Sequence, residues 1–377
     1  MKNTSSRSTL RLILAGAACT ALLIGSTACS ASSESTGGSG SESGGSGAEF
    51  PESGSGELNF FNFTNYINPD TLEKFTEDTG IKVNVDTFSS AEEMVAKVKT
   101  GSATYDVVTV SDYVAEDLIA SGQLMEVDAT QWPNGGNIEQ DFVDVFFDEG
   151  RKFTTPYAMI YNGIGYNTDD IKEPVDSWKT YFSVPEGSSG KIGLHDSQTF
   201  VIDAALFAVG SEPCTTDGAA YQKAIDLLND FKPAVKVISS DGTIDRLAGG
   251  ETVLSTMWNG SFARAQEQNS ALQYSLPTDG YTMGGDNLAI LTNSQNADNA
   301  KIFMNWMLDP ANAASNANWI KYSVPLTGIE EELGKLDDGG GKVIIPTEEE
   351  AERGILQVPC SADVKEQYDK LWTMFKG

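Results

Sequence analysis

The chain has 377 residues, a length that usually means two domains or two lobes, and its hydrophobic fraction of 40% is ordinary for a globular protein. Its 25 Lys and Arg residues against 54 Asp and Glu residues give a formal net charge of −29. This balance argues against a nucleic-acid partner and against an anionic membrane surface, because both require a basic protein surface. It is compatible with a cationic ligand, although most of the carboxylates are expected to form a solvated acidic surface.

The N-terminus has the pattern of an export signal. Three basic residues precede a mostly apolar stretch, residues 12–24, which is too short to span a membrane comfortably. Ser26-Thr27-Ala28-Cys29 then resembles a bacterial lipobox, although Ser26 stands where such motifs usually carry Leu. We predict a signal peptide over residues 1–28 and lipidation of Cys29, which would anchor the protein to the cell membrane on its extracytoplasmic side. An uncleaved membrane helix is the alternative.

A flexible tether is predicted over residues 29–56, which after the cysteine are almost entirely Ser, Gly, Glu and Ala. Cys19 would leave with the signal peptide. Cys214 and Cys360 then remain as an even pair in an exported chain. They form either a disulfide, which that compartment permits, or two free thiols.

The folded body is predicted to begin near Glu57 with alternating strands and helices. Asn68-Pro69 has the N-cap and first-turn residues of a helix that ends at Gly80, and Ser90 to Glu93 form a capping box. This alternation is typical of an α/β fold with a largely parallel sheet. Strands are expected at 58–63, 82–88, 106–110 and 252–257, and helices at 69–79, 90–100, 113–120, 202–209, 219–231, 300–307 and 368–375.

Open α/β sheets bind ligands at the carboxyl ends of their strands, so the residues that follow strands are the candidates for a site. The clusters to inspect are Phe63-Thr64-Asn65-Tyr66, Ser111-Asp112-Tyr113, His195-Asp196, Trp258-Asn259 and Gly285-Asp286. The most specific stretches of the sequence are Phe61-Asn62-Phe63-Thr64-Asn65-Tyr66, residues 72–83, Met257-Trp258-Asn259-Gly260-Ser261 and Asp286-Asn287-Leu288-Ala289-Ile290. Together they resemble the spermidine/putrescine-binding family of bacterial extracellular solute-binding proteins, and the likeness covers nearly all of the body.

The resemblance implies a two-lobed periplasmic-binding-protein fold of type II, with the ligand in a cleft between the lobes. Lobe one would comprise residues 57–161 and 285–330, and lobe two residues 162–284 and 331–377. Cys214 and Cys360 would then share lobe two. The implied function is delivery of a polyamine to the permease of an ABC transporter, by a monomer that closes its lobes around the ligand.

The resemblance also implies ligand contacts, which combine acceptors for an ammonium group with aromatic walls for its methylene chain. Asp196 and Asp286 are expected to place two carboxylates across the cleft. Thr199 and Gly284 stand where the spermidine binder has Glu and Trp, which favours a diamine over spermidine. The expected ligand contacts are Phe63, Thr64, Tyr66, Ser111, Tyr113, Asp196, Trp258, Asp286, Tyr322 and Gln357.

Two other readings remain open from the sequence. The same fold could bind a different small cation, such as an amino-acid derivative or a thiamine-like molecule. A hydrolase is disfavoured, because His195 is the one histidine and no Gly-x-Ser-x-Gly elbow is present. No cysteine or histidine cluster predicts a metal site, and we expect no cofactor.

Overall fold

The computed structural model describes residues 50–88, 91–101, 104–336 and 342–377. The predicted signal peptide, Cys29, most of the predicted tether and Ser90 of the predicted capping box lie outside the described residues. The end of that tether belongs to the fold, because the Phe50 ring packs 5.7 Å from Trp132 and Asn299 Nδ2 donates to Ser55 O at 2.9 Å. No helix in the described part is long and apolar enough to cross a bilayer.

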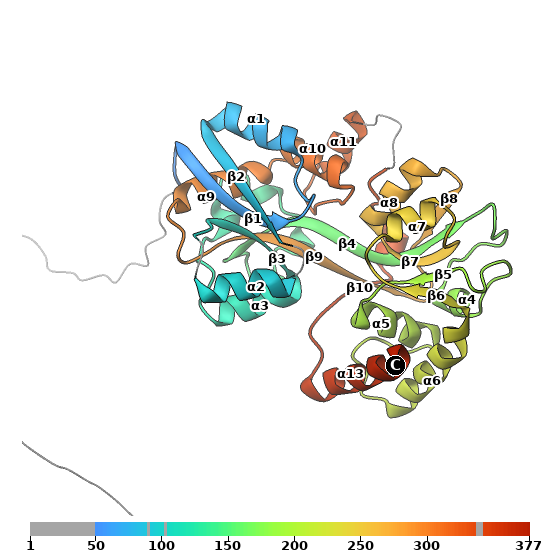
Figure 1. The fold of residues 1–377 in the computed structure, drawn as a ribbon. Helices are drawn as coiled ribbons and strands as arrows, with labels where there is room; N and C mark the ends of the chain where they lie inside the picture. The colour runs from blue at the N-terminus through green and yellow to red at the C-terminus, as the bar shows by residue number, and fades with distance from the viewer. Residues whose placement is uncertain (1–49, 89–90, 102–103, 337–341) are drawn as a thin grey trace, which may run out of the picture. The chain divides into compact units, whose positions relative to one another are not determined.

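Ten strands form one mixed sheet in the order β2-β1-β3-β9-β4-β7-β5-β6, with β8 beside β4 and β10 beside β9 (Figure 1). The strands are β1 (Gly56–Phe63), β2 (Ile81–Phe88), β3 (Val107–Ser111), β4 (Thr154–Asn167), β5 (Ile192–Leu194), β6 (Val235–Ile238), β7 (Leu254–Trp258), β8 (Leu272–Ser275), β9 (Tyr281–Ile290) and β10 (Gly354–Leu356).

The predicted α/β fold is confirmed, but the sheet is mixed rather than largely parallel. Strand β1 runs parallel to β2 and β3, and β5 runs parallel to β6 and β7. Between these two groups, β4 and β9 pair antiparallel with each other, and each also pairs antiparallel with a neighbouring group. The two parallel groups are therefore joined through one long antiparallel pair.

The two largest hydrophobic cores lie one on each side of this pair and are covered by helices. The first core surrounds Phe60, Phe75 and Phe303, and the second surrounds Trp178 and Phe231. The helices are α1 (Pro69–Thr79), α2 (Ala91–Thr100), α3 (Asp112–Ala120), α4 (Trp178–Phe182), α5 (Gln198–Ala208), α6 (Gly218–Phe231), α7 (Thr243–Ala248), α8 (Asn259–Gln268), α9 (Ala297–Met307), α10 (Pro310–Ile320), α11 (Ile329–Lys335), α12 (Glu348–Ala351) and α13 (Ala362–Lys376).

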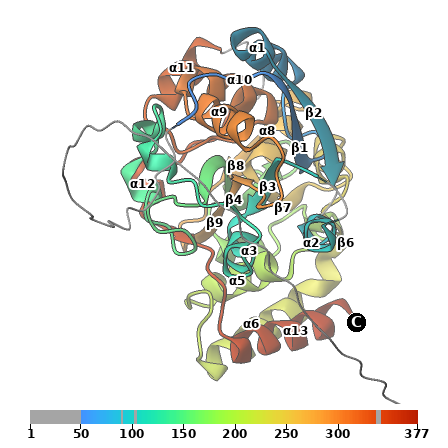
Figure 2. The same ribbon diagram turned by 90° about the vertical axis from the view of Figure 1, so that its left-hand side faces the viewer.

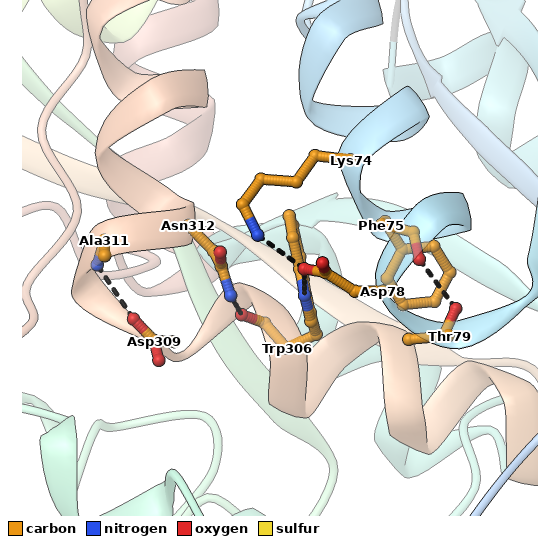
Figure 3. A network of polar contacts seen from close by, with 8 residues as sticks. All are labelled: Lys74, Phe75, Asp78, Thr79, Trp306, Asp309, Ala311 and Asn312. Atoms are coloured by element: carbon orange, nitrogen blue, oxygen red, sulfur yellow. Dashed lines mark hydrogen bonds and ion pairs between the residues drawn. The ribbon is translucent and has the colours of Figure 1, made fainter.

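Helix α1 shows how sequence signals and tertiary contacts combine. The Asn68 side chain accepts from Asp70 N, and Gly80 ends the helix in the left-handed conformation with its N–H on Thr76 O at 2.8 Å. At the C-terminal end, Asp78 Oδ2 accepts from Trp306 Nε1 of α9 at 3.0 Å (Figure 3). These contacts fix α1 against α9 at the outer side of the first core.

A disulfide joins Cys214, in the loop after α5, to Cys360, just before α13. In both ribbon views α13 lies beside α6, and in the second core it also contacts α5 (Figures 1 and 2). The Tyr368 hydroxyl donates to Asp203 Oδ1 at 2.7 Å and links α13 to α5. The C-terminal segment is thus held in the second core both covalently and by a buried hydrogen bond.

The buried Asp203 should make stability depend on pH. Burial raises the pKa of its carboxyl to about 7. In the unfolded chain the pKa of an Asp carboxyl is about 4. The contribution of Asp203 to the free energy of unfolding is therefore fully present below about pH 4 and is lost as the pH rises to about 7. Asp203→Asn keeps an acceptor for Tyr368 but cannot ionise. We expect the free energy of unfolding of the variant to exceed that of the wild type by roughly 2–4 kcal/mol near pH 8.

Urea unfolding at a series of pH values measures this difference. Between about pH 5 and pH 8 the wild type should lose more stability than Asp203→Asn. Identical pH dependence in the two proteins would contradict the assignment to Asp203.

Candidate functional site

A cavity of about 370 Å³ is lined by residues from both sides of the β4–β9 pair. Its walls come from the ends of β1, β3 and β7, the middle of β4 and β9, the start of α5 and the segment after β10. Strand ends therefore meet here, as expected for an α/β sheet. The residues singled out from the sequence that line this cavity are Phe63, Tyr66, Ser111, Tyr113, Trp258, Asp286, Tyr322 and Gln357.

Strand register brings these residues together. Ser111 at the end of β3 lies opposite Asp286 in β9, and Trp258 at the end of β7 lies opposite Asn162 in β4. Gln357 follows β10, and its backbone N–H donates to Met283 O of β9 at 2.8 Å. The long pair β4–β9 is thus the frame on which the polar and aromatic groups of both sides are positioned.

Asp286 is the most buried carboxylate in the cavity wall, with 5% of its surface exposed. Its Oδ1 accepts from Ser111 Oγ at 2.6 Å and its Oδ2 from the Tyr66 hydroxyl at 3.0 Å. Burial raises the pKa of Asp286, and the two hydroxyl donors partly oppose that shift. Among the described residues its bonded partners are neutral, so the site has a negative charge to offer a cationic ligand.

Aromatic rings surround the carboxylate. The Tyr66 ring lies 5.7 Å from Tyr322 and 5.8 Å from Phe63, in edge-to-face arrangements. Trp258 lines the opposite part of the cavity and packs 4.3 Å from His195. Such rings bury methylene groups and attract cations through their faces.

Two expected contacts lie elsewhere. The Asp196 side chain is exposed and forms an ion pair with Lys376 at 2.8 Å, so it does not face the cavity. The loop before α5 instead presents Ser197 to the cavity. Thr64 is exposed and donates through Oγ1 to Phe88 O at 3.3 Å. The expectation of carboxylates from Asp196 and Asp286 on opposite sides of one cleft is therefore not met in this structure.

The cavity has a second carboxylate, Asp112 at the start of α3, which follows a predicted strand but is not among the expected ligand contacts. Its Oδ2 accepts from Gly285 N at 2.7 Å and its Oδ1 from Asn287 Nδ2 at 2.8 Å. Burial raises its pKa to about 6, against the lowering effect of these hydrogen bonds. The residue lies between Ser111 and Tyr113, but an acidic residue in the first turn of a helix is usually explained by the helix dipole.

Asn162 in β4 is a second cavity residue that was missed. It is 5% exposed, and its Nδ2 donates to Thr282 Oγ1 at 2.7 Å. Its Oδ1 is buried and has no hydrogen-bond partner in the structure. A buried unpaired acceptor is costly, so a side-chain rotation that brought it to a ligand donor in the cavity would be favoured.

The residues that depart from the resemblance also have defined places. Gly284 lines the cavity, and a Cβ added there would meet Asp112 Oδ2 at 3.8 Å as its nearest neighbour. That wall is therefore open where the spermidine binder has Trp. Thr199 is the second residue of α5 and does not line the cavity.

The one histidine of the sequence lies outside this cavity. His195 is fully buried, and its Nδ1 lies 2.9 Å from Thr256 Oγ1. Burial lowers its pKa to about 3, which keeps it neutral, and it does not line the cavity. Within the described ranges, no group of three His, Cys, Asp or Glu residues could hold a metal ion.

A second, more open hollow of about 830 Å³ is less suited to a cation. Its lining includes Arg264, whose guanidinium lies 5.7 Å from the Trp319 ring, and Lys321, which pairs with Glu267 at 3.0 Å. Together with Asp245 and Glu267 in the same lining, these cations leave no net negative charge to attract a positively charged ligand. We therefore take the smaller, aromatic cavity as the functional site.

Comparison with known proteins gives a consistent result. The sequence pattern of the family "Bacterial extracellular solute-binding protein" matches residues 70–335. The spermidine/putrescine-binding periplasmic protein of Escherichia coli (strain K12) is 30% identical over 315 residues, which cover 82% of this chain and 90% of that relative. The putrescine-binding periplasmic protein SpuD of Pseudomonas aeruginosa (strain UCBPP-PA14) is 29% identical over 340 residues, covering 85% and 92%.

A solved structure is also similar. The substrate-binding protein PotD of a spermidine/putrescine ABC transporter from Streptococcus pneumoniae, in complex with calcium and HEPES, superimposes with a TM-score of 0.77. It is 28% identical and covers 85% of this chain and 98% of its own. The similarity thus extends over most of this chain.

Proposed function

Because the chain belongs to the spermidine/putrescine-binding family of bacterial extracellular solute-binding proteins, we propose that its cavity captures a polyamine for uptake by an ABC transporter. The single observation that carries this assignment is the buried carboxylate of Asp286, held by neutral hydroxyls inside an aromatic cavity. A carboxylate without a protein cation binds an ammonium group through charge-assisted hydrogen bonds. The surrounding rings accept the methylene chain.

The other end of a diamine would meet the acceptors of β4 and of the segment after β10. The Oδ1 of Asn162 is unpaired but buried, and it would accept one hydrogen bond from an ammonium group once lobe closure or a side-chain rotation exposes it to the cavity. Gln357 lines the same part of the site, and Trp258 offers a ring face. A flexible diamine chain could thus connect Asp286 to Asn162 across the cavity, with both of its charged ends hydrogen-bonded.

Capture would involve closure of two lobes. We propose that residues 57–161 and 285–330 form one lobe and residues 162–284 and 331–377 the other, except that the rest of α11 belongs to the first lobe because Leu333 packs on the first core. Strands β4 and β9 carry cavity residues from both and are the natural crossing segments. Closure by small rotations at these crossings would bury the ligand, and the closed protein would dock on the permease.

The N-terminal pattern completes the proposed role. A lipid on Cys29 would keep a monomeric body at the extracytoplasmic side of the membrane, close to the permease. Residues between Cys29 and the start of the fold would act as the tether. Mass spectrometry of membrane fractions would detect the lipid, and a Cys29→Ala variant released into the medium would support this localisation.

Calorimetric titration of the purified body with putrescine and with spermidine tests the function. We expect both amines to bind, with putrescine about tenfold tighter, because one cationic amine of spermidine would be buried without an acidic partner. Apart from Asp286 and Asp112, which lie on the same wall, the described lining of the cavity has no carboxylate for the third amine of spermidine, and Asp196 is engaged by Lys376 outside it. Tighter spermidine binding would contradict the preference, and heats of dilution alone with every amine would contradict the function.

A further inference from the structure

We propose that Asp112 is a specificity-determining residue that forms, with Asp286, a two-carboxylate binding end for one cationic group of the ligand. This inference rests on the proposed polyamine-binding function. The sequence predicted two carboxylates on opposite sides of the cavity. In this proposal the two carboxylates, Asp112 and Asp286, lie on the same wall. The ligand would then be selected mainly by the cationic group at one of its ends.

The geometry places the two carboxylates on neighbouring segments. Ser111, the last residue of β3, is in register with Asp286 of β9. Asp112 is the next residue in the chain, and its Oδ2 accepts from the N–H of Gly285, the neighbour of Asp286. Both carboxylates line the same cavity, and of the described residues in its lining they are the acidic ones.

The charge of this pair is only partly compensated. The nearest cation is Arg151, which is buried and donates to Asn287 Oδ1 at 2.8 Å rather than to either carboxylate. Arg151 also interacts electrostatically with Asp148, so its charge is shared. Two buried carboxylates beside one shared cation leave room for a positive ligand group that binds between them.

The adjacent glycines keep this end accessible. A Cβ at Gly284 would meet nothing nearer than Asp112 Oδ2 at 3.8 Å, and one at Gly285 would lie 3.3 Å from Asp112 Oδ1. At these two positions the wall beside Asp112 therefore carries no side chain that could shield its carboxylate. The four oxygens of the pair provide acceptors for the three donors of a primary ammonium.

Calorimetric titration of three variants with putrescine tests this role. Asp112→Asn should weaken binding by at least about tenfold, since a charge-assisted hydrogen bond becomes a neutral one. Asp117→Asn removes the same charge from an exposed position of α3 and should bind as the wild type does. Asp196→Asn should also bind within about twofold of the wild type, since its carboxylate is paired with Lys376 outside the cavity.

The pH dependence of binding separates a charge role from a structural one. Asp286 on β9 and Arg151 before β4 are the charged groups that face Asp112, and Asp148 lies beyond Arg151. The pKa of Asp112 is raised to about 6, so affinity in the wild type should fall as the pH is lowered from about 7.5 to about 5.5. In Asp112→Asn that fall should be smaller, with the remainder due to Asp286.

The outcomes are distinct. Asp112→Asn binding within twofold of the wild type, or a larger loss in Asp196→Asn, would overturn the role of Asp112 while leaving polyamine binding intact. A weakened Asp112→Asn with an unchanged pH profile would show a structural effect and would also overturn it. A wild type that binds no amine would remove the proposed function as well. Melting temperatures of the unliganded proteins show whether each variant is folded.

Discussion

Asp286→Asn is expected to reduce putrescine affinity more than any other single substitution in the cavity. Removing one partner of a buried, hydrogen-bonded charge pair costs about 2–5 kcal/mol, which is roughly 30-fold to several thousandfold in the dissociation constant. The ammonium would be left in an apolar, aromatic site with weaker acceptors. Calorimetric titration of the variant with putrescine measures this loss.

Two controls separate lost binding from lost folding. Burial raises the pKa of Asp286, so its charged form is disfavoured in the unliganded protein. The unliganded Asp286→Asn variant should therefore melt at the same temperature as the wild type or higher. Asp298→Asn changes a largely exposed carboxylate on α9 and should leave affinity unchanged. Binding by Asp286→Asn within threefold of the wild type would exclude Asp286 as the anchor.

Removal of the disulfide is expected to have the largest effect on stability. Cys214 and Cys360 are 146 residues apart, and closing a loop of that length restricts the unfolded chain by up to about 5 kcal/mol. Measured values for native disulfides are about 2–5 kcal/mol. We expect Cys214→Ser with Cys360→Ser to lower the free energy of unfolding by that amount, as measured by urea unfolding.

Reductant provides the control for this measurement. It should destabilise the wild type by a similar amount and have no effect on the double serine variant. Because Cys360 follows Gln357 by three residues, the same loss of restraint should loosen the segment that carries Gln357 into the cavity. A change in unfolding free energy below about 1 kcal/mol would show that the second core alone fixes the C-terminal helix.

Local signals predicted those parts of the fold that local chemistry determines. Asn68, Pro69 and Gly80 mark the ends of α1 because capping depends on neighbouring residues. Strand β4 was not predicted, since its residues are buried on both faces and carry neither alternation nor a helical period. Its antiparallel pairing with β9 depends on residues more than a hundred positions away, and this pairing makes the sheet mixed.

The residues of the site also divide into those that local sequence predicts and those whose position depends on distant parts of the chain. Ser111, Trp258 and Asp286 could be predicted because they end or occupy strands whose pattern the resemblance also covers. Asp196 could not be placed, since its direction is set by Lys376, which lies 180 residues later at the C-terminus. Asn162 is in the unpredicted strand β4, and its free acceptor is a property of three-dimensional packing alone.

A crystal structure of the protein with bound putrescine would test the central claim most directly. One ammonium nitrogen should lie within about 3 Å of an Asp286 oxygen and close to the Asp112 carboxylate, with the carbon chain directed toward Trp258 and Asn162. Ligand density outside this cavity, or an ammonium held by Asp196 while Asp286 keeps only Ser111 and Tyr66 as partners, would contradict it.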